Sequence, residues 1–180
     1  MNIELSVEDQ RWDENSIAKI IEESAESVFA ELKLKHDDVE IDFLCADDQE
    51  IRYLNKTYRG IDKPTNVLSF PAESYDDYED EHDDVCECSC GHDCHCGECD
   101  CSDDEDCPPC LLGSVALAYE TIEREAAEQD KTFENHLRHL IVHSVLHLLG
   151  YDHIEHEDAA KMEELEIRIL KKMNISDPYQ

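Results

Sequence analysis

The chain has 180 residues, and its 47 Asp and Glu against 15 Lys and Arg give a formal net charge of -32. This length suits one domain with a hydrophobic core of its own and is too short for two comfortable ones. The sequence contains no apolar stretch that would span a bilayer, and its start has neither the basic nor the apolar region of a secretory signal. We therefore expect a soluble, cytoplasmic protein with no membrane association.

Hydrophobic periodicity predicts four strands and five helices. Apolar and polar residues alternate in residues 2–7 and 39–45, as in half-buried strands, and Asp47 with Glu50 forms a capping box at the start of a helix. The predicted strands are residues 2–7, 39–45, 66–70 and 112–118, and the predicted helices are residues 13–34, 47–58, 121–129, 133–149 and 157–173. This order predicts an α+β fold, with a mixed four-stranded β-sheet packed with helices.

The segment 72–110 differs in composition from the rest of the chain. It holds nine of the ten cysteines and 16 acidic residues, and it contains neither Lys nor Arg. A segment with so little apolar content cannot bury enough surface to offset the entropy of ordering. We therefore expect a single domain over residues 1–180 that this segment interrupts as a disordered or metal-binding insert between two strands.

The histidines near the end of the predicted helix 133–149 carry the clearest chemical signal. His143 and His147 are four residues apart, so their imidazoles lie on one helix face and can bind the same ion. Gly150 allows the chain to turn back, which brings His153 to that ion as a third ligand. Three neutral imidazoles leave one position of a tetrahedral zinc open, as in catalytic sites, and other divalent metals remain alternatives. Because the rest of the helix is apolar nearly all round, we expect it to be buried and central.

The same histidine spacing occurs in the metzincin peptidases, so peptide hydrolysis is an alternative. Those enzymes use a Glu directly after the first His as general base, and this chain has Ser144 there. A serine does not take a proton from water at neutral pH, which disfavours the peptidase interpretation. We expect His136 and His139, which extend the stripe, to support the ligands or to line the cleft.

A basic cluster lies in the first half of the chain. Lys56, Arg59 and Lys63 fall within eight residues of an otherwise acidic sequence, and the run continues as Pro64-Thr-Asn-Val-Leu-Ser-Phe-Pro71. Arg offers a planar fork to phosphate oxygens, and the hydroxyl and amide side chains add hydrogen bonds. A solvated turn is the alternative, but the pairing with a hydrolytic metal favours a phosphate substrate. The candidate substrate-binding residues are Arg59, Lys63, Asn66 and Ser69.

These two segments, residues 58–71 and 143–153, together resemble the signatures of the YbeY family of bacterial rRNA maturation endoribonucleases. The resemblance implies an α+β fold, and it implies zinc held by His143, His147 and His153, which with a substrate-facing Arg59 form the catalytic set. It further implies single-strand-specific RNA cleavage in maturation of the 16S rRNA 3′ end and in ribosome quality control. The expected partners are ribosomal RNA and small-subunit proteins, and the oligomeric state stays open.

The chain departs from the family in two places. The family usually has an acidic residue after Leu-Gly, whereas this chain has Ser114, which raises the question of whether an acid needed for metal orientation or proton transfer is missing. The connection before Leu112 is also much longer than the family's short loop. No general base is obvious, and His139 and Asp152 are the candidates.

The cysteine spacing in the insert is typical of soft-metal chelation, and in a cytosolic protein metal binding is favoured over disulfides. The alternative is a tolerated low-complexity loop. A non-enzymatic metal-binding or buffering protein is the rival function, but it leaves the basic segment unexplained. The candidate additional metal ligands are Cys86, Cys88, Cys90, Cys94, Cys96, Cys99, Cys101, Cys107 and Cys110.

Overall fold

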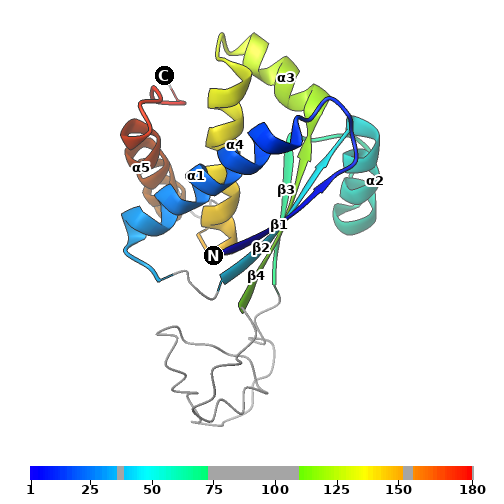
Figure 1. The fold of residues 1–180 in the computed structure, drawn as a ribbon. Coiled ribbons are helices and arrows are strands. Elements are labelled where there is room, and N and C mark those ends of the chain that lie inside the picture. Colours follow the sequence, from blue (N-terminus) through cyan, green and yellow to red (C-terminus); the bar gives the residue numbers. More distant parts are fainter. Residues whose placement is uncertain (36–38, 73–109, 152–155, 180) are drawn as a thin grey trace, which may run out of the picture.

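The computed structural model describes residues 1–35, 39–72, 110–151 and 156–179 (Figure 1). The predicted insert therefore lies outside the described residues except for its two ends. The strands are β1 (Asn2–Val7), β2 (Val39–Ala46), β3 (Val67–Pro71) and β4 (Cys110–Ala118). The helices are α1 (Glu14–Leu32), α2 (Asp48–Arg59), α3 (Tyr119–Glu128), α4 (Phe133–Leu148) and α5 (His156–Lys172). The predicted order of elements is confirmed, and the predicted ends are correct to within about two residues.

The strands form one mixed sheet in the order β1-β2-β4-β3. β1 and β4 run parallel to β2, whereas β3 runs antiparallel to β4. β3 is an edge strand, which is why it can end in Pro71 without losing a ladder hydrogen bond. The sheet and its five helices confirm the predicted α+β class.

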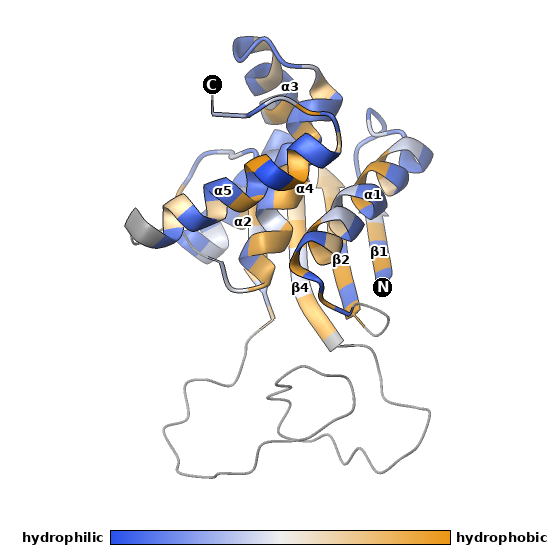
Figure 2. Cartoon of the chain, turned by 90° about the vertical axis from the view of Figure 1, so that its left-hand side faces the viewer, coloured by the Kyte–Doolittle hydropathy of each residue, from blue (hydrophilic) through white to orange (hydrophobic). Residues whose placement is uncertain are grey.

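The two faces of the sheet carry separate hydrophobic cores. Alternation along β2 and β4 sends Phe43, Val115 and Leu117 to one face, where they pack with α1, α4 and α5. Leu68, Ala116 and their neighbours point to the other face and pack against Ile51 of α2. Figure 1 shows α2 on the opposite side of the sheet from α1 and α4, and Figure 2 shows the hydrophobic residues gathered on α4 and the strands. The predicted central position of the histidine helix is confirmed.

Local signals fix the ends of the helices that frame the site. The Thr132 side chain accepts a hydrogen bond from Asn135 N at the start of α4, and Asp47 accepts from Glu50 N at the start of α2. α2 ends at Gly60, whose φ of 70° suits the left-handed cap. None of the described helices combines the length and the apolar character that a membrane crossing requires.

Candidate active site

Three histidines form a stripe along the partly exposed side of α4. Leu140, Ile141, Val145 and their apolar neighbours are buried, whereas His139, His143 and His147 are intermediate in exposure. The side chain of His143 keeps a 25% exposed fraction. The spacing of four residues therefore places the three imidazoles in a row that the helix does not bury.

His143 is anchored by a carboxylate on another helix. Its Nδ1 lies 2.7 Å from Oε1 of Glu166, which is fully buried in α5. An ionised carboxylate only accepts hydrogen bonds, so Nδ1 carries a proton and donates it to Glu166. The other ring nitrogen of His143, Nε2, lies 3.1 Å from Nε2 of His147, within hydrogen-bond distance. Two imidazole nitrogens on one helix face and this close together can also ligate a single cation.

The geometry of this pair fits a zinc ion. Zn–N bonds of about 2.0–2.1 Å in a tetrahedral site hold two ligand nitrogens about 3.3 Å apart, close to the 3.1 Å between the two imidazoles. The third predicted ligand, His153, lies outside the described residues, as does the candidate base Asp152. Within the described part of the chain no three His, Cys, Asp or Glu side chains form a metal-binding group. The structure thus brings together two of the three predicted ligands.

Glu166 binds two donors besides His143. Oε2 accepts from His139 Nε2 at 2.9 Å and from the Tyr179 hydroxyl at 2.5 Å. Burial by itself raises the pKa of this carboxyl, but the hydrogen bonds from its three donors lower it to about 2. Burial, together with the adjacent carboxylate, raises the pKa of Tyr179, so its hydroxyl remains a donor. Glu166 is therefore an ionised acceptor behind the histidine pair.

Sequence reasoning missed both Glu166 and Tyr179. The buried stripe of α5 contains Met162, Leu165 and Ile169 at helical spacing, and Glu166 stands within it. An acidic residue in an apolar stripe is a signal that a partner is present, because an unpaired buried carboxylate is costly. Tyr179 follows the helix and carries no comparable pattern.

His139 has a supporting position, as predicted for it. Its Nε2 is engaged with Glu166, and its Nδ1 is buried without a hydrogen-bond partner among the described residues. Ser144 is fully buried, and its hydroxyl donates to the Leu140 carbonyl at 2.8 Å. A buried serine facing its own helix does not replace the peptidase Glu, which agrees with the sequence argument against peptide hydrolysis.

His136 belongs to a second polar group. Its Nε2 lies 3.1 Å from Glu125 Oε2, which also accepts from Asn66 Nδ2 at 2.9 Å. Asn66 Oδ1 in turn accepts from Val67 N at 2.7 Å. Both ends of the Asn66 amide are thus engaged with the protein, so this residue anchors the start of β3 to α3 and α4.

The basic segment divides into paired and unpaired cations. Asp62 binds Arg52 at 2.6 Å and Lys56 at 2.8 Å, and these two hydrogen bonds lower its pKa to about 2. Arg59 and Lys63 are exposed and form no ion pair within the described part of the chain. Asp62 therefore neutralises Arg52 and Lys56. Arg59 and Lys63 remain for an anionic ligand.

A buried asparagine holds this basic segment in place. Asn55 is 2% exposed, and its Nδ2 donates to the Lys63 carbonyl at 2.8 Å. The α2 cap adds a bond from Ile61 N to the Asn55 carbonyl at 3.3 Å. The backbone that follows Arg59 is thereby hydrogen-bonded to Asn55 of α2 at two points, Ile61 and Lys63.

The structure does not place Arg59 against the histidines. α2 and α4 cover opposite faces of the sheet, and both pack on the edge strand β3 (Figure 1). The Tyr58 ring contacts Phe70 of β3 with centroids 5.2 Å apart. Ser69 pairs in register with Val115 and shares the histidine face of the sheet. The predicted residues therefore lie around the edge formed by β3, from α2 on one side to α4 on the other.

The position of Ser114 answers the question raised by the sequence. Ser114 alternates with Val115, so it faces α2 and not the histidine helix, and its hydroxyl lies 3.3 Å from Asp42 Oδ2. An acidic side chain at this position would point away from His143 and His147. The serine consequently removes no group from the described part of the histidine site.

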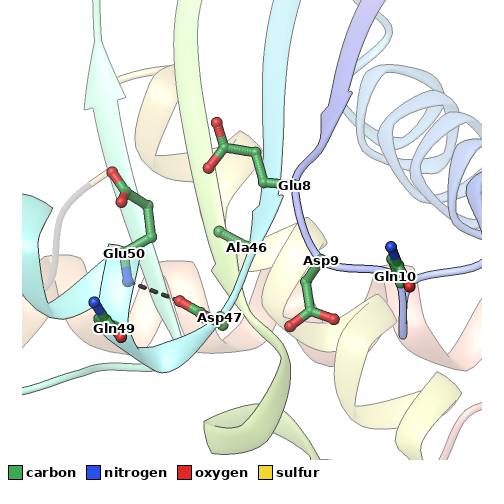
Figure 3. A pocket seen from close by; sticks show the side chains of 7 residues that line it. All are labelled: Glu8, Asp9, Gln10, Ala46, Asp47, Gln49 and Glu50. Carbon is green, nitrogen blue, oxygen red and sulfur yellow. Dashed lines mark hydrogen bonds between the residues drawn. The ribbon is translucent and has the colours of Figure 1, made fainter.

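A pocket of about 450 Å³ lies elsewhere, beyond the carboxyl ends of β1 and β2 (Figure 3). Four carboxylates line it, from Glu8, Asp9, Asp47 and Glu50, together with Gln10, Ala46 and Gln49. Asp9 pairs with Arg11 and Asp47 caps α2. A hollow with this charge repels phosphate, so it is not where an anionic substrate binds.

The predicted cysteine ligands from Cys86 to Cys107 lie outside the described residues, and of Cys110 only the backbone is described, at the start of β4. Cys45 is fully buried in β2, and burial raises the pKa of its thiol to about 12. Cys45 is a core residue, which agrees with its separation from the others in sequence.

Comparisons with known proteins point to one family. The family model described as Endoribonuclease YbeY matches residues 2–174. The protein of that name from Sinorhizobium fredii (strain NBRC 101917 / NGR234) is 39% identical over 186 residues, covering 99% of this chain and 92% of the relative. The protein of the same name from Ruegeria sp. (strain TM1040) is 40% identical over 179 residues, covering 99% of this chain and 96% of the relative.

The fold has a counterpart among solved structures. The solution structure of TM1509 from Thermotoga maritima superposes with a TM-score of 0.53 at 22% identity, covering 99% of this chain and 95% of that one. This similarity concerns the fold, while the sequence matches extend over both the basic segment and the histidine helix. The chain belongs to the YbeY family of endoribonucleases.

Proposed function

We propose that this chain is a zinc-dependent endoribonuclease that cleaves single-stranded RNA in maturation of the 16S rRNA 3′ end and in ribosome quality control, in the cytoplasm. The observation that carries the proposal is the short distance of 3.1 Å between Nε2 of His143 and Nε2 of His147, with His143 anchored through its other nitrogen. Both nitrogens lie on the partly exposed side of α4, close enough to ligate one cation once the proton between them is lost. Membership of the endoribonuclease family supplies the substrate class.

In the proposed mechanism His143 and His147, together with His153, would hold a zinc ion. Zinc in such a site would supply Lewis acidity and a more acidic water for hydrolysis of a phosphodiester. Arg59 binds a non-bridging phosphate oxygen and stabilises the charge that develops there, and Lys63 holds a neighbouring phosphate. Ser69 contributes a hydroxyl on the histidine face, whereas Asn66 acts by fixing the start of β3. RNA bound in this way passes around the β3 edge of the sheet.

The charge of the chain restricts where RNA binds. At -32, most of the surface repels phosphate, so affinity depends on Arg59, Lys63 and the metal, not on a broad basic face. We expect a poor nuclease on free, non-specific RNA. A basic surface of a small-subunit protein would complement the acidic faces and bring the enzyme to its RNA.

The test compares the wild type with His147→Ala on a single-stranded RNA that covers the 3′ end of 16S rRNA, both free and within the small subunit. A duplex of the same sequence is the substrate control, and bound zinc is measured for both proteins. We expect zinc-dependent cleavage of the single strand by the wild type. His147→Ala should cleave no RNA and should bind one zinc ion fewer than the wild type, because segment 72–110 keeps its own thiols. Equal cleavage by both proteins, or none by either on both substrates, contradicts the proposal.

For the segment 72–110 we propose an additional metal-binding role within the single domain. Its support is the spacing of thiols at one to three intervening residues between Cys86 and Cys101. A protein that binds several zinc ions and cleaves no RNA would instead be a metal buffer, which is the rival function.

A further inference from the structure

The carboxylate behind His143 depends on a residue from the segment that follows α5. Glu166 is fully buried, and its two oxygens have different partners. Oε1 accepts from His143 Nδ1, while Oε2 accepts from His139 Nε2 and from the Tyr179 hydroxyl. With Oε2 occupied by two donors, Oε1 is the atom directed at His143.

Tyr179 is itself held at several points. The Pro178 carbonyl accepts from Lys131 Nζ at 2.8 Å, and Tyr179 N donates to Asp177 Oδ1 at 2.9 Å. The Tyr179 ring meets His139 edge-on, with centroids 5.6 Å apart and an interplanar angle of 83°. Tyr179 is nevertheless 48% exposed, and it is not among the residues that form or pack against the hydrophobic core. Its main described contact is therefore the hydroxyl on Glu166.

A carboxylate in this setting determines which ring nitrogen of His143 bears the proton. If the Glu166 carboxylate rotates or withdraws, His143 Nδ1 loses its acceptor, and the ring can place its proton on Nε2 instead. That proton would occupy the position that faces Nε2 of His147. Carboxylates that fix a metal-ligating histidine in this way commonly affect metal affinity by about 10- to 100-fold.

We propose that Glu166 and Tyr179 are positioning residues: Tyr179 holds the Glu166 carboxylate, and Glu166 keeps His143 protonated at Nδ1 with Nε2 directed at the cation. The proposal deepens the proposed function, on which it rests for the identity of the cation. Which nitrogen of the His143 ring bears the proton is a property of the zinc-free protein, so it can be measured without RNA cleavage.

The experiment uses five variants of the full chain. Tyr179→Phe removes only the hydroxyl, and Glu166→Gln keeps the shape of the side chain but replaces an accepting oxygen by a donating amide. The matched controls are Tyr53→Phe and Glu164→Gln, which change exposed residues of the same types. For each protein, the zinc affinity of the α4 site is measured by titration against a competing chelator. The titration is followed through the His143 ¹⁵N shifts, so that zinc bound by segment 72–110 is not counted. The protonated nitrogen of His143 is identified in the zinc-free protein from its ring ¹⁵N chemical shifts.

We expect zinc binding about tenfold weaker for Tyr179→Phe and about 100-fold weaker for Glu166→Gln, with both controls unchanged. The ¹⁵N shifts of His143 should move from the Nδ1-protonated form towards a mixture in both test variants. Glu166→Asp separates positioning from charge, because it keeps the negative charge but shortens the reach. A positioning role predicts weakened zinc binding for Glu166→Asp, whereas a purely electrostatic role leaves it unchanged and overturns the proposal.

Unchanged ¹⁵N shifts and zinc affinity in Tyr179→Phe overturn the role of Tyr179, and this conservative variant answers the question even if Glu166→Gln does not fold. Failure of the proposed function is a separate result. In that case the wild type binds zinc and cleaves no RNA, while the variants still alter the His143 shifts.

Discussion

Glu166 Oε1 lies 2.7 Å from His143 Nδ1, although the residues are 23 positions apart and belong to different helices. This bond joins α5 to the partly exposed stripe of α4. It explains why a carboxylate is retained at a fully buried position, where its desolvation would otherwise be costly. The histidine pair is therefore held by tertiary structure and not by helical spacing alone.

Zinc should stabilise the folded protein, because it binds the converged imidazoles only when α4 and its partners are formed. At free zinc about 100 times above its dissociation constant, the gain is about 2.7 kcal/mol. For a domain of this size we expect the melting temperature to rise by about 5–10 °C. Calorimetry with zinc and then with a chelator measures the shift, and His147→Ala should show none. A zinc-induced shift of equal size in His147→Ala would place the stabilising ion elsewhere.

Arg59→Ala should lower kcat for RNA cleavage by about 100- to 1000-fold, since it removes a charge that stabilises the reacting phosphate. Zinc content should stay the same, because Arg59 does not contact the described histidines. Lys19→Ala, which removes an exposed cation from α1, is the control for net charge. Single-turnover kinetics on single-stranded RNA measure the effect. A rate within twofold of the wild type would remove Arg59 from the catalytic set.

Asn55→Asp should destabilise the protein by about 1–3 kcal/mol, because it places an accepting carboxylate against the Lys63 carbonyl in a buried site. Urea unfolding measures the loss, with Asn15→Asp as an exposed control on α1. RNA affinity should also fall, since the backbone that carries Arg59 and Lys63 loses its attachment. Should stability and affinity both match those of Asn15→Asp, the asparagine does not anchor that segment.

Gly113→Ala should lower the free energy of unfolding by about 2–4 kcal/mol. A Cβ there would lie 2.3 Å from the Phe70 carbonyl oxygen and 2.9 Å from Leu148 Cδ2, and the φ of 142° disfavours a side chain. Gly60→Ala is the matched control, because it has a positive φ but no atom within 4 Å of its Cβ, and should cost about 1 kcal/mol. Chemical denaturation compares the two. Equal losses of unfolding free energy in the two variants would show that the close approach of β3 and α4 to Gly113 does not affect stability.

Replacing residues 73–109 with a short Asn-Gly turn should lower the number of zinc ions bound, because it removes every cysteine except Cys45 and Cys110. The high-affinity site on α4 should remain, so one ion should still bind. Isothermal titration of both proteins counts the sites. An unchanged stoichiometry would contradict a metal-binding role for the insert.

Much of this fold could be predicted from local patterns. Strand alternation around Phe43 and Val115 and the apolar surroundings of His143 are properties of neighbouring residues, so sequence reveals them. The same alternation already implies that Ser114 faces away from the histidines. Glu166 and Tyr179 reach His143 only after α5 packs on α4, and no local pattern specifies that contact. The pairing of Asn66 with Glu125 depends on tertiary structure in the same way.

The hydrogen bond from Ala72 N to the Leu112 carbonyl, next to the paired Pro71 and Gly113, brings the two ends of the interrupting segment side by side. Closing a flexible loop between fixed ends becomes harder only slowly with length, by about 0.6 kcal/mol per doubling. Evolution can therefore lengthen, shorten or exchange the sequence between β3 and β4 with little effect on folding. This hairpin is an attachment point at which the enzyme can acquire a new module without redesign of its catalytic domain.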